Sequence, residues 1–359
     1  MTKKRFDMLL LAALAIFCFS TEGFFLPVSL QTQNSVNAAY ADEDEDEDLE
    51  EDGMEDEYAA ADEDAAADEE GVEDEDEDEE EFDPDAPLPK PKKVSGSKLE
   101  TSDGVLLSAT FFPGNRGKKS VPVILLHDWN GERKDVFTLA EELQAVGCAV
   151  LVPDLRGHGK SNRVLVGPED TEEFEAKKRM TLQDMQAVIA ADMPALKRFL
   201  MQQNNAGNLN IDKLCVGGVG YGGMMAAYFA NADWNPMVKR KKAKSSQGDV
   251  KGFFIVSPPK NLKGVRFTDT FSYPNWASQV SCIVIGSEAQ KKPVLAMQNQ
   301  LKKVCGNDAL DRCKFITVEN ESDEKPADLI QDPDSDAVRN VLAFVEIRFI
   351  QRDILWKSR

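Results

Sequence analysis

The sequence predicts an α/β domain with a mainly parallel central sheet covered by helices on both faces. Two short strand-like segments flank Asp103-Gly104, which is the pattern of a β-hairpin. The run Val121–Leu126 is apolar throughout, as expected for a central parallel strand that is buried on both faces. Strand-like and helix-like segments then alternate to the end of the chain, which is the order that βαβ units produce.

Each element follows from its own pattern. Apolar, β-branched and aromatic residues predict strands over 97–101, 106–112, 121–126, 149–153, 213–217, 252–257, 281–285 and 314–318. Apolar residues at helical spacing predict helices over 134–146, 182–201, 224–230, 293–304 and 336–349. Gly147 suits the end of the first helix, because glycine adopts the left-handed conformation that closes many helices.

The first residues have the composition of a targeting signal. Lys3, Lys4 and Arg5 precede a run of about a dozen apolar residues, which is too short for a spanning helix of ~20 residues. Residues 39–41 read AYA and supply a small-x-small cleavage pattern, so we predict a signal peptide over residues 1–41. An uncleaved anchor is the alternative, and only then do we expect contact with a membrane. Either way the protein is predicted to be exported, and to be secreted or held in the cell envelope or periplasm.

Charge is segregated along the chain. The formal net charge is −22, but residues 42–86 contain 30 acidic residues and no Lys or Arg. Such a segment has almost nothing to bury and is predicted to be disordered. It either binds cations or basic partners, or serves as a solubilising spacer. Residues 87–95 are predicted to be a stiff Pro-rich linker, and residues 96–359 the folded domain. Because the acidic segment would compete for basic surface and no recognition motif is present, nucleic acid is not an expected partner.

Cysteine and histidine patterns predict no metal or cofactor site. Cys148, Cys215 and Cys282 fall in or beside predicted buried strands, where a free cysteine behaves as a small apolar residue. Cys305 and Cys313 lie close together in the sequence and would either pair in an oxidising compartment or stay free.

Three segments carry a family resemblance. Residues 123–131 read VILLHDWNG, residues 153–161 read PDLRGHGKS, and residues 218–223 read GVGYGG. In this order and spacing they resemble the His-Gly loop, the D-x-R-G-H-G-x-S loop and the G-x-S-x-G-G nucleophile elbow of α/β-hydrolases, over the chain from about Lys98 onward. The resemblance implies the α/β-hydrolase fold. Because residues 258–279 are few, it also implies no large cap domain.

The chemistry that the resemblance implies lacks its reagents in this sequence. Gly220 stands where the nucleophilic serine is expected, and a glycine cannot attack a carbonyl. The chain has two histidines, His127 and His158, and both belong to the early loops rather than to the late position of the family's base. The acid is expected after the seventh strand of the family, where Glu288 lies one position early and is at most a remnant.

The remaining features favour binding. Backbone N–H groups near Trp129 and Tyr221, with Asp128, could form an oxyanion-type pocket for a small carbonyl-bearing or anion-bearing ligand. The alternative for Trp129 and Tyr221 is packing over the sheet edge. His127 and His158 are expected to brace their loops through hydrogen bonds.

Three functions stay open on the sequence alone. The first is an exported protein that has lost its catalytic triad and binds a ligand or a protein partner. The second is an active hydrolase of esters or peptides with an atypical arrangement, for which the candidate reagents are Ser257, Asp154, Asp128 and Glu288. The third is an electrostatic module in which the acidic segment binds the partner and the domain is a scaffold. A fold alone does not choose among them.

Overall fold

The computed structural model describes residues 87–359 except residues 169, 235–247, 260, 263, 273–278 and 320–324. The predicted signal peptide and the predicted acidic segment both lie outside the described residues. None of the helices in the described part is both long and apolar enough to cross a membrane.

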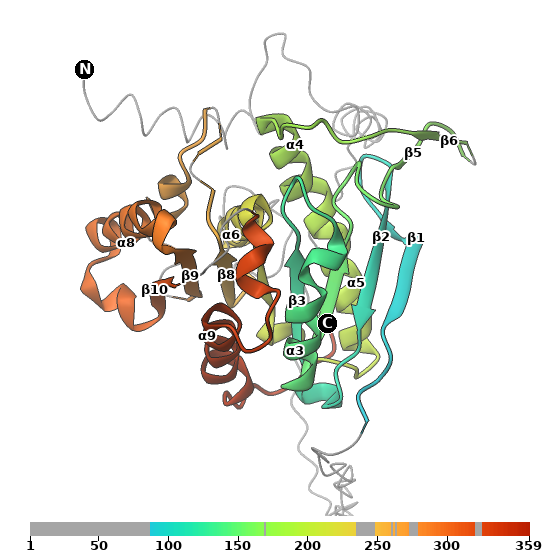
Figure 1. Cartoon of the computed structure of the whole chain (residues 1–359). Helices are drawn as coiled ribbons and strands as arrows, with labels where there is room; N and C mark the ends of the chain where they lie inside the picture. The colour runs from blue at the N-terminus through green and yellow to red at the C-terminus, as the bar shows by residue number, and fades with distance from the viewer. Residues whose placement is uncertain are drawn as a thin grey trace, which may run out of the picture. The chain divides into compact units, whose positions relative to one another are not determined.

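One twisted sheet forms the centre of the domain (Figure 1). Its strands in the described residues are β1 Lys92–Glu100, β2 Val105–Phe112, β3 Val121–Leu126, β4 Cys148–Pro153, β5 Arg163–Leu165, β6 Thr171–Glu173, β7 Cys215–Val219, β8 Gly252–Val256, β9 Ser281–Ser287 and β10 Cys313–Val318. The order across the sheet is β10-β9-β8-β7-β3-β4-β2, with β1 and β5 both paired to β2 and β6 beyond β5.

Strand direction follows the prediction. Every neighbouring pair from β4 through β3 to β10 is parallel, whereas β2 runs antiparallel to β4 and to β1. A sheet that begins with an antiparallel hairpin, places β4 outside β3 and then adds strands in sequence is the strand order of the α/β-hydrolase fold. The predicted hairpin at Asp103-Gly104 is the turn between β1 and β2.

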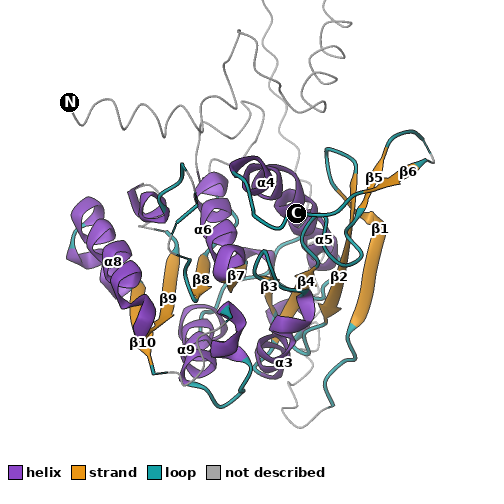
Figure 2. Ribbon diagram, turned by 45° about the horizontal axis from the view of Figure 1, so that its top comes forward, coloured by secondary structure: helices purple, strands orange, loops and turns teal. Residues whose placement is uncertain are grey.

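Helices cover both faces of the sheet (Figure 2). Those described are α3 Phe137–Ala145, α4 Leu182–Ala187, α5 Met193–Asn205, α6 Gly220–Trp234, α8 Lys291–Cys305 and α9 Asp336–Val345. The apolar side chains of α5, α6 and α8 belong to one core cluster, and those of α3 and α9 to a second cluster across the sheet. The predicted layers are therefore confirmed. The connection from β8 to β9 contains, in its described part, one short 3-10 helix, Phe267–Ser272, and no large cap.

Some predicted boundaries differ from the structure. The predicted linker over 87–95 is too long, because β1 already begins at Lys92 and pairs with β2 from there. Val94 is buried while Lys93 and Ser95 on either side of it are exposed, an alternation that the prolines just upstream obscure. The predicted helix 182–201 is divided by a π-helical segment, Val188–Asp192. Pro194 follows directly in the first turn of α5, and its ring lacks an N–H to continue the helical bonding.

The cysteines are all unpaired in the described chain. Cys148, Cys215 and Cys282 are buried as predicted, and the pair Cys305–Cys313 does not form a disulfide. Cys313 on β10 lies instead directly across from Cys282 on β9.

Candidate functional site

The turn between β7 and α6 has the backbone of an elbow. β7 ends at Val219 and α6 begins at Gly220, whose φ is +55°. Left-handed backbone of this kind is strained for residues with a side chain, and glycine adopts it at little cost. A sharp strand-turn-helix at this point is what the G-x-S-x-G-G pattern implies.

The first turn of α6 lies directly against the end of β3. A Cβ atom on Gly222 would stand 2.3 Å from the carbonyl oxygen of His127 and 2.7 Å from that of Leu126. Both contacts are to backbone, which cannot rotate away, so this position requires a glycine. The close approach of α6 to β3 thus explains the glycine at this position of the motif.

Asp128 occupies the space in front of the elbow. A Cβ atom on Gly220 would lie 2.1 Å from Asp128 Oδ1. The same oxygen accepts a hydrogen bond of 2.8 Å from the backbone N–H of Tyr221. That N–H is one of the donors that the sequence assigned to an oxyanion-type pocket. The predicted pocket is therefore not open, since Asp128 fills it rather than lining it.

The environment of Asp128 disfavours its charge. The residue is only 8% exposed, and burial raises the pKa of its carboxyl above the ordinary value. Backbone N–H groups of Tyr221, Asn130 and Trp129 oppose that shift. No Lys or Arg of the described chain forms a salt bridge with Asp128, so the backbone N–H groups carry most of its stabilisation in the charged form.

Tyr221 and Trp129 differ in what they contribute. Tyr221 is partly exposed, and its ring meets Phe267 edge to face at 6.1 Å between centroids. Trp129 is almost completely buried, and its Nε1–H donates to the carbonyl oxygen of Lys177 at 2.8 Å. Its ring packs against His158 with a centroid distance of 4.8 Å. For Trp129 the packing alternative is the one that the structure shows.

Both histidines brace loops, as predicted. His127 is fully buried; its Nδ1–H donates to the carbonyl of Asp128 at 2.7 Å, and its Nε2 accepts from the N–H of Leu155 at 3.0 Å. Burial lowers its pKa to about 3, so the ring is neutral. His158 Nε2 lies 2.5 Å from the carbonyl oxygen of Trp129. Neither ring contacts a hydroxyl or thiol among the described residues, and so neither is placed to act as a base.

The acid position is also altered. Glu288 is more than half exposed, and its carboxylate pairs with Lys291 at 3.2 Å on the surface. Two residues further on, the side-chain amide of Gln290 donates to Ser257 Oγ at 3.0 Å. Ser257 is buried at the carboxyl end of β8 and has a φ of +56°, the one positive value outside glycine in the described chain. Its partner is an amide rather than a base.

Asp154 completes the set of predicted reagents and is structural. Its carboxylate lies 3.4 Å from the Arg133 guanidinium and accepts the N–H of Lys160 at 2.9 Å. Among the described residues, no hydrogen bond joins any two of the candidates Ser257, Asp154, Asp128 and Glu288. They occupy four separate environments at this edge of the sheet.

A hollow of about 350 Å³ is lined in part by Trp129. The loops after β3 and β4 and the segment 175–178 form it, through Trp129, Asn130, Gly131, Gly157, His158, Gly159, Asn162, Glu175, Ala176, Lys177 and Lys178. Three of these residues are glycines, which leave backbone groups open to a ligand. Sequence reasoning missed this pocket, because residues 175–178 belong to no motif and are held there by hydrogen bonds to distant residues, from Trp129 to the Lys177 carbonyl and from the Ala176 N–H to the Gly157 carbonyl.

Comparison with known proteins gives similarity at the level of structure. No protein-family model matches the chain, and no curated protein sequence matches it. An esterase of Pyrococcus furiosus is 18% identical, with 72% of this chain and 93% of that chain covered and a TM-score of 0.48. The thermostable carboxylesterase EstE1 from a metagenomic library is 14% identical, with 74% and 91% covered and a TM-score of 0.49. An esterase from the archaeon Pyrobaculum calidifontis is 13% identical, with 74% and 86% covered and a TM-score of 0.48. On its own strand order and the turn at Gly220, the chain has the α/β-hydrolase fold.

Proposed function

We propose that this chain is an exported α/β-hydrolase-fold protein that has lost the catalytic triad and acts as a binding protein. The observation that carries the proposal is the pair Gly220 and Asp128. Gly220 offers no nucleophile, and the Asp128 carboxylate stands within 2.1 Å of where a side chain at that position would begin. A substrate carbonyl would have to displace a buried carboxylate from the Tyr221 N–H before it could be polarised.

The absence of a usable base supports the same conclusion. A weak nucleophile needs a base within hydrogen-bonding reach, held by a third group. Both nitrogens of His127 are engaged with backbone groups, and those of His158 face backbone carbonyls. Neither histidine is therefore available as the base, and the sequence contains no other histidine.

Turnover is the direct test. The full chain should show no covalent labelling by a fluorophosphonate probe and no hydrolysis of p-nitrophenyl esters above a buffer control. Covalent labelling of the folded chain, or turnover that persists through stringent purification, would contradict the non-catalytic proposal.

A second candidate function rests on Ser257. Its left-handed backbone and buried position at the carboxyl end of β8 are features that functional residues often share. The active-hydrolase alternative predicts that turnover is found and that Ser257→Ala abolishes it. Ser161→Ala is the matched control, because Ser161 is a buried serine whose hydroxyl donates to the Asp154 carbonyl.

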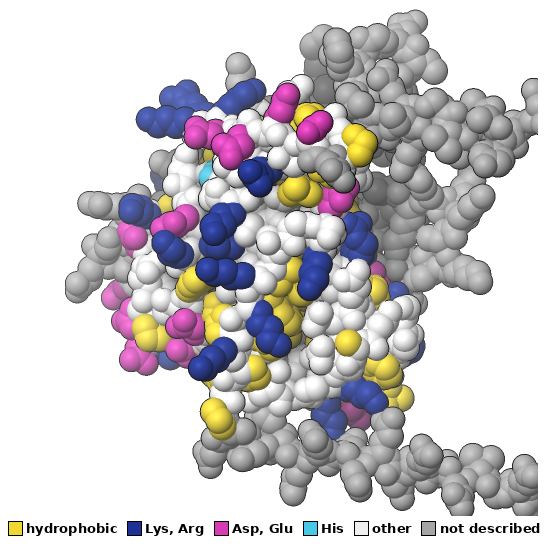
Figure 3. Space-filling model, turned by 90° about the vertical axis from the view of Figure 1, so that its right-hand side faces the viewer, with side chains coloured by type: hydrophobic (Ala, Val, Ile, Leu, Met, Phe, Trp, Pro, Cys, Tyr) yellow, Lys and Arg dark blue, Asp and Glu magenta, His cyan; other side chains and the backbone are white. Residues whose placement is uncertain are grey.

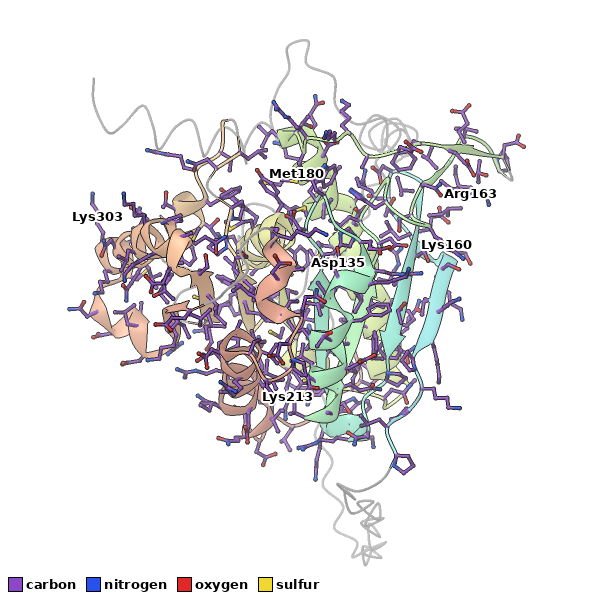
Figure 4. The ribbon with its side chains drawn as sticks, viewed as in Figure 1. Asp135, Lys160, Arg163, Met180, Lys213 and Lys303 are labelled. Carbon is purple, nitrogen blue, oxygen red and sulfur yellow. The ribbon has the colours of Figure 1, made fainter. Side chains whose placement is uncertain are left out.

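The pocket beside Trp129 is where we propose that a small anion-bearing or carbonyl-bearing ligand binds. Lys177 and Lys178 supply positive charge, and the side chains of Asn130 and Asn162 supply amide donors. A panel of small carboxylates should raise the melting temperature of the wild-type chain, and Lys177→Ala with Lys178→Ala should remove the shift. Lys303→Ala, on α8 far from this pocket, is the matched control (Figure 4).

A protein partner is the other class of ligand. The side of the domain that carries β1 and β2 shows Lys and Arg side chains across its middle, with hydrophobic side chains between them (Figure 3). Lys92, Lys93 and Lys98 of the edge strand β1 are exposed. An acidic protein surface is the complement of such a face.

A further inference from the structure

The segment after the last helix is held against the domain in extended form. The chain leaves the π-helical turn Glu346–Ile350 and runs without helix or strand from Asp353 to Arg359. Ile354 and Trp356 are partly buried, whereas Leu355 between them is 79% exposed. This alternation is that of an extended peptide with one side on a surface. The surface is formed by the end of α5, the loop after it and the short 3-10 helix Ile211–Lys213.

Three asparagine side chains bind the backbone of this segment. The amide of Asn210 donates to the carbonyl of Ile354 at 2.7 Å, and that of Asn204 to the carbonyl of Lys357 at 3.0 Å. Asn205 both donates to the backbone oxygen of Arg359 at 2.6 Å and accepts its N–H at 2.9 Å. Contacts of this kind recognise peptide backbone whatever its side chains.

Two of the three asparagines are also held by contacts within the domain. Asn204 is completely buried, and its side-chain oxygen accepts the N–H of Ile211 at 2.9 Å. The side-chain oxygen of Asn210 accepts the N–H of Asp212 at 3.1 Å. These two bonds orient the side chains of Asn204 and Asn210 independently of the segment, which is the condition for a preorganised binding surface.

Two side chains of the segment make specific contacts with the domain. The Trp356 Nε1–H donates to the carbonyl of Asn204 at 3.2 Å, and the ammonium of Lys118 lies 4.9 Å from the centre of its ring. The Arg359 guanidinium bridges Asp212 and Asp249, at 2.8 Å to each. An indole and a guanidinium that each meet a dedicated partner give selectivity beyond the backbone contacts.

We propose that this surface is a peptide-binding groove, selective for an extended segment with a tryptophan and an arginine three residues later, and that residues 353–359 occupy it in the present structure. The groove lies at the amino-terminal ends of the parallel strands, since the 3-10 helix Ile211–Lys213 leads directly into β7. In Figure 4, Lys213 marks this end and Met180 marks the opposite end of the domain. The elbow begins where β7 ends, so the groove is a separate site and does not depend on the proposed function.

A segment tethered to its own groove has a high effective concentration, in the millimolar range for short linkers. A free peptide therefore competes poorly with the wild-type segment and well with a weakened one. The full chain carrying Trp356→Ala and Arg359→Ala keeps the groove and loses both selective contacts. The probe is a fluorescent peptide with the sequence of residues 353–359, followed by fluorescence anisotropy.

We expect the peptide to bind this double variant at least about tenfold more tightly than it binds the wild-type chain. Peptides with alanine in place of the tryptophan or of the arginine should each bind the variant about tenfold more weakly or worse. A cooperatively folded double variant that does not bind the peptide overturns the proposal. Equal binding of the native and alanine peptides overturns it as well.

If the double variant does not fold, Arg359→Ala alone takes its place, because it leaves Trp356 seated. The peptide should then bind the single variant more tightly than the wild type, and equal affinity for the two proteins overturns the proposal. Asp212→Asn in the same background removes one carboxylate partner of the peptide's arginine. It should weaken binding of the native peptide and leave binding of the peptide with alanine in place of the arginine unchanged. A purely structural role for the segment predicts no difference between the two peptides.

Discussion

At the scale of single residues, Gly220 and Asp128 share one small volume. A Cβ atom at Gly220 would be 2.1 Å from Asp128 Oδ1, and the φ of +55° is unfavourable for a residue with a side chain. Gly220→Ser should therefore lower the free energy of unfolding by about 1–3 kcal/mol, as overpacked substitutions do. Urea unfolding followed by circular dichroism measures this change.

The double variant separates the clash from the backbone strain. Adding Asp128→Ala to Gly220→Ser removes the overlapping carboxylate, so the two changes should be coupled by about 1 kcal/mol or more. Gly220→Ala should behave like Gly220→Ser, since the Cβ atom makes the clash. Neither serine variant should hydrolyse esters efficiently, because no histidine is free to act on it. Purely additive effects would mean that Asp128 moves aside without cost.

His127 predicts a pH dependence of stability. Its pKa is lowered from 6.5 to about 3 by burial, so the unfolded chain binds a proton that the folded chain refuses. The contribution of His127 to the free energy of unfolding should be fully present above pH 6.5 and should be lost progressively as the pH drops from there toward 3. At pH 4.5 this single group should cost about 2–3 kcal/mol relative to pH 7.5.

Carboxylates also titrate in this range, so the comparison needs a matched variant. His127→Gln keeps an acceptor for the Leu155 N–H but has no titrating ring. The variant is expected to be less stable than the wild type at pH 7.5, with a shallower loss of stability toward pH 4.5. The difference between the two urea-unfolding profiles reports His127 alone. Parallel profiles would show that the ring is accessible to protons in the folded state.

At the scale of elements, the sequence predicts strands better than their surroundings. The continuous apolar runs of β3, β4, β8 and β9 predict these strands directly, because central parallel strands are buried on both faces. The β5–β6 hairpin was missed, since both strands are only three residues long and β6 is exposed throughout, with no apolar alternation. The π-helical interruption after α4 was missed as well, because the apolar spacing continues through it.

The packing of α6 on β3 predicts a large effect at Gly222. Gly222→Ala places a Cβ atom 2.3 Å from the His127 carbonyl oxygen, so α6 must shift away from the sheet. We expect a loss of about 3 kcal/mol or more in the free energy of unfolding. Gly167→Ala is the control, since its nearest neighbour would be 3.5 Å away, and it should change stability by about 0.5 kcal/mol at most. A mild Gly222→Ala variant would show that the first turn of α6 is adaptable.

At the scale of the whole molecule, the motifs predicted the position of the elbow correctly but not that the Asp128 side chain lies in front of it. Three loop motifs in series were enough for the fold and for the position of Gly220. That Asp128 would turn its carboxylate onto the Tyr221 N–H depends on a side-chain rotamer and on the missing Cβ atom across from it, neither of which has a local signal. The groove around residues 353–359 depends on contacts about 150 positions apart in sequence, so periodicity and motifs cannot reveal it.

Charge segregation also belongs to this scale, because it determines which part of the chain a polycation can bind. Deleting residues 42–86 removes 30 acidic residues and no Lys or Arg, and so changes the formal net charge from −22 to +8. The full chain should bind immobilised polylysine at low ionic strength, and the deletion variant should not. Binding of the full chain should fade as salt rises, since the Debye length shrinks from about 10 Å at 0.1 M to about 3 Å at 1 M. The deletion leaves every core residue from Val94 onward in place, so the two proteins should melt at similar temperatures. If the deletion variant binds polylysine as well as the full chain does, the acidic segment is a spacer and the binding surface belongs to the folded domain.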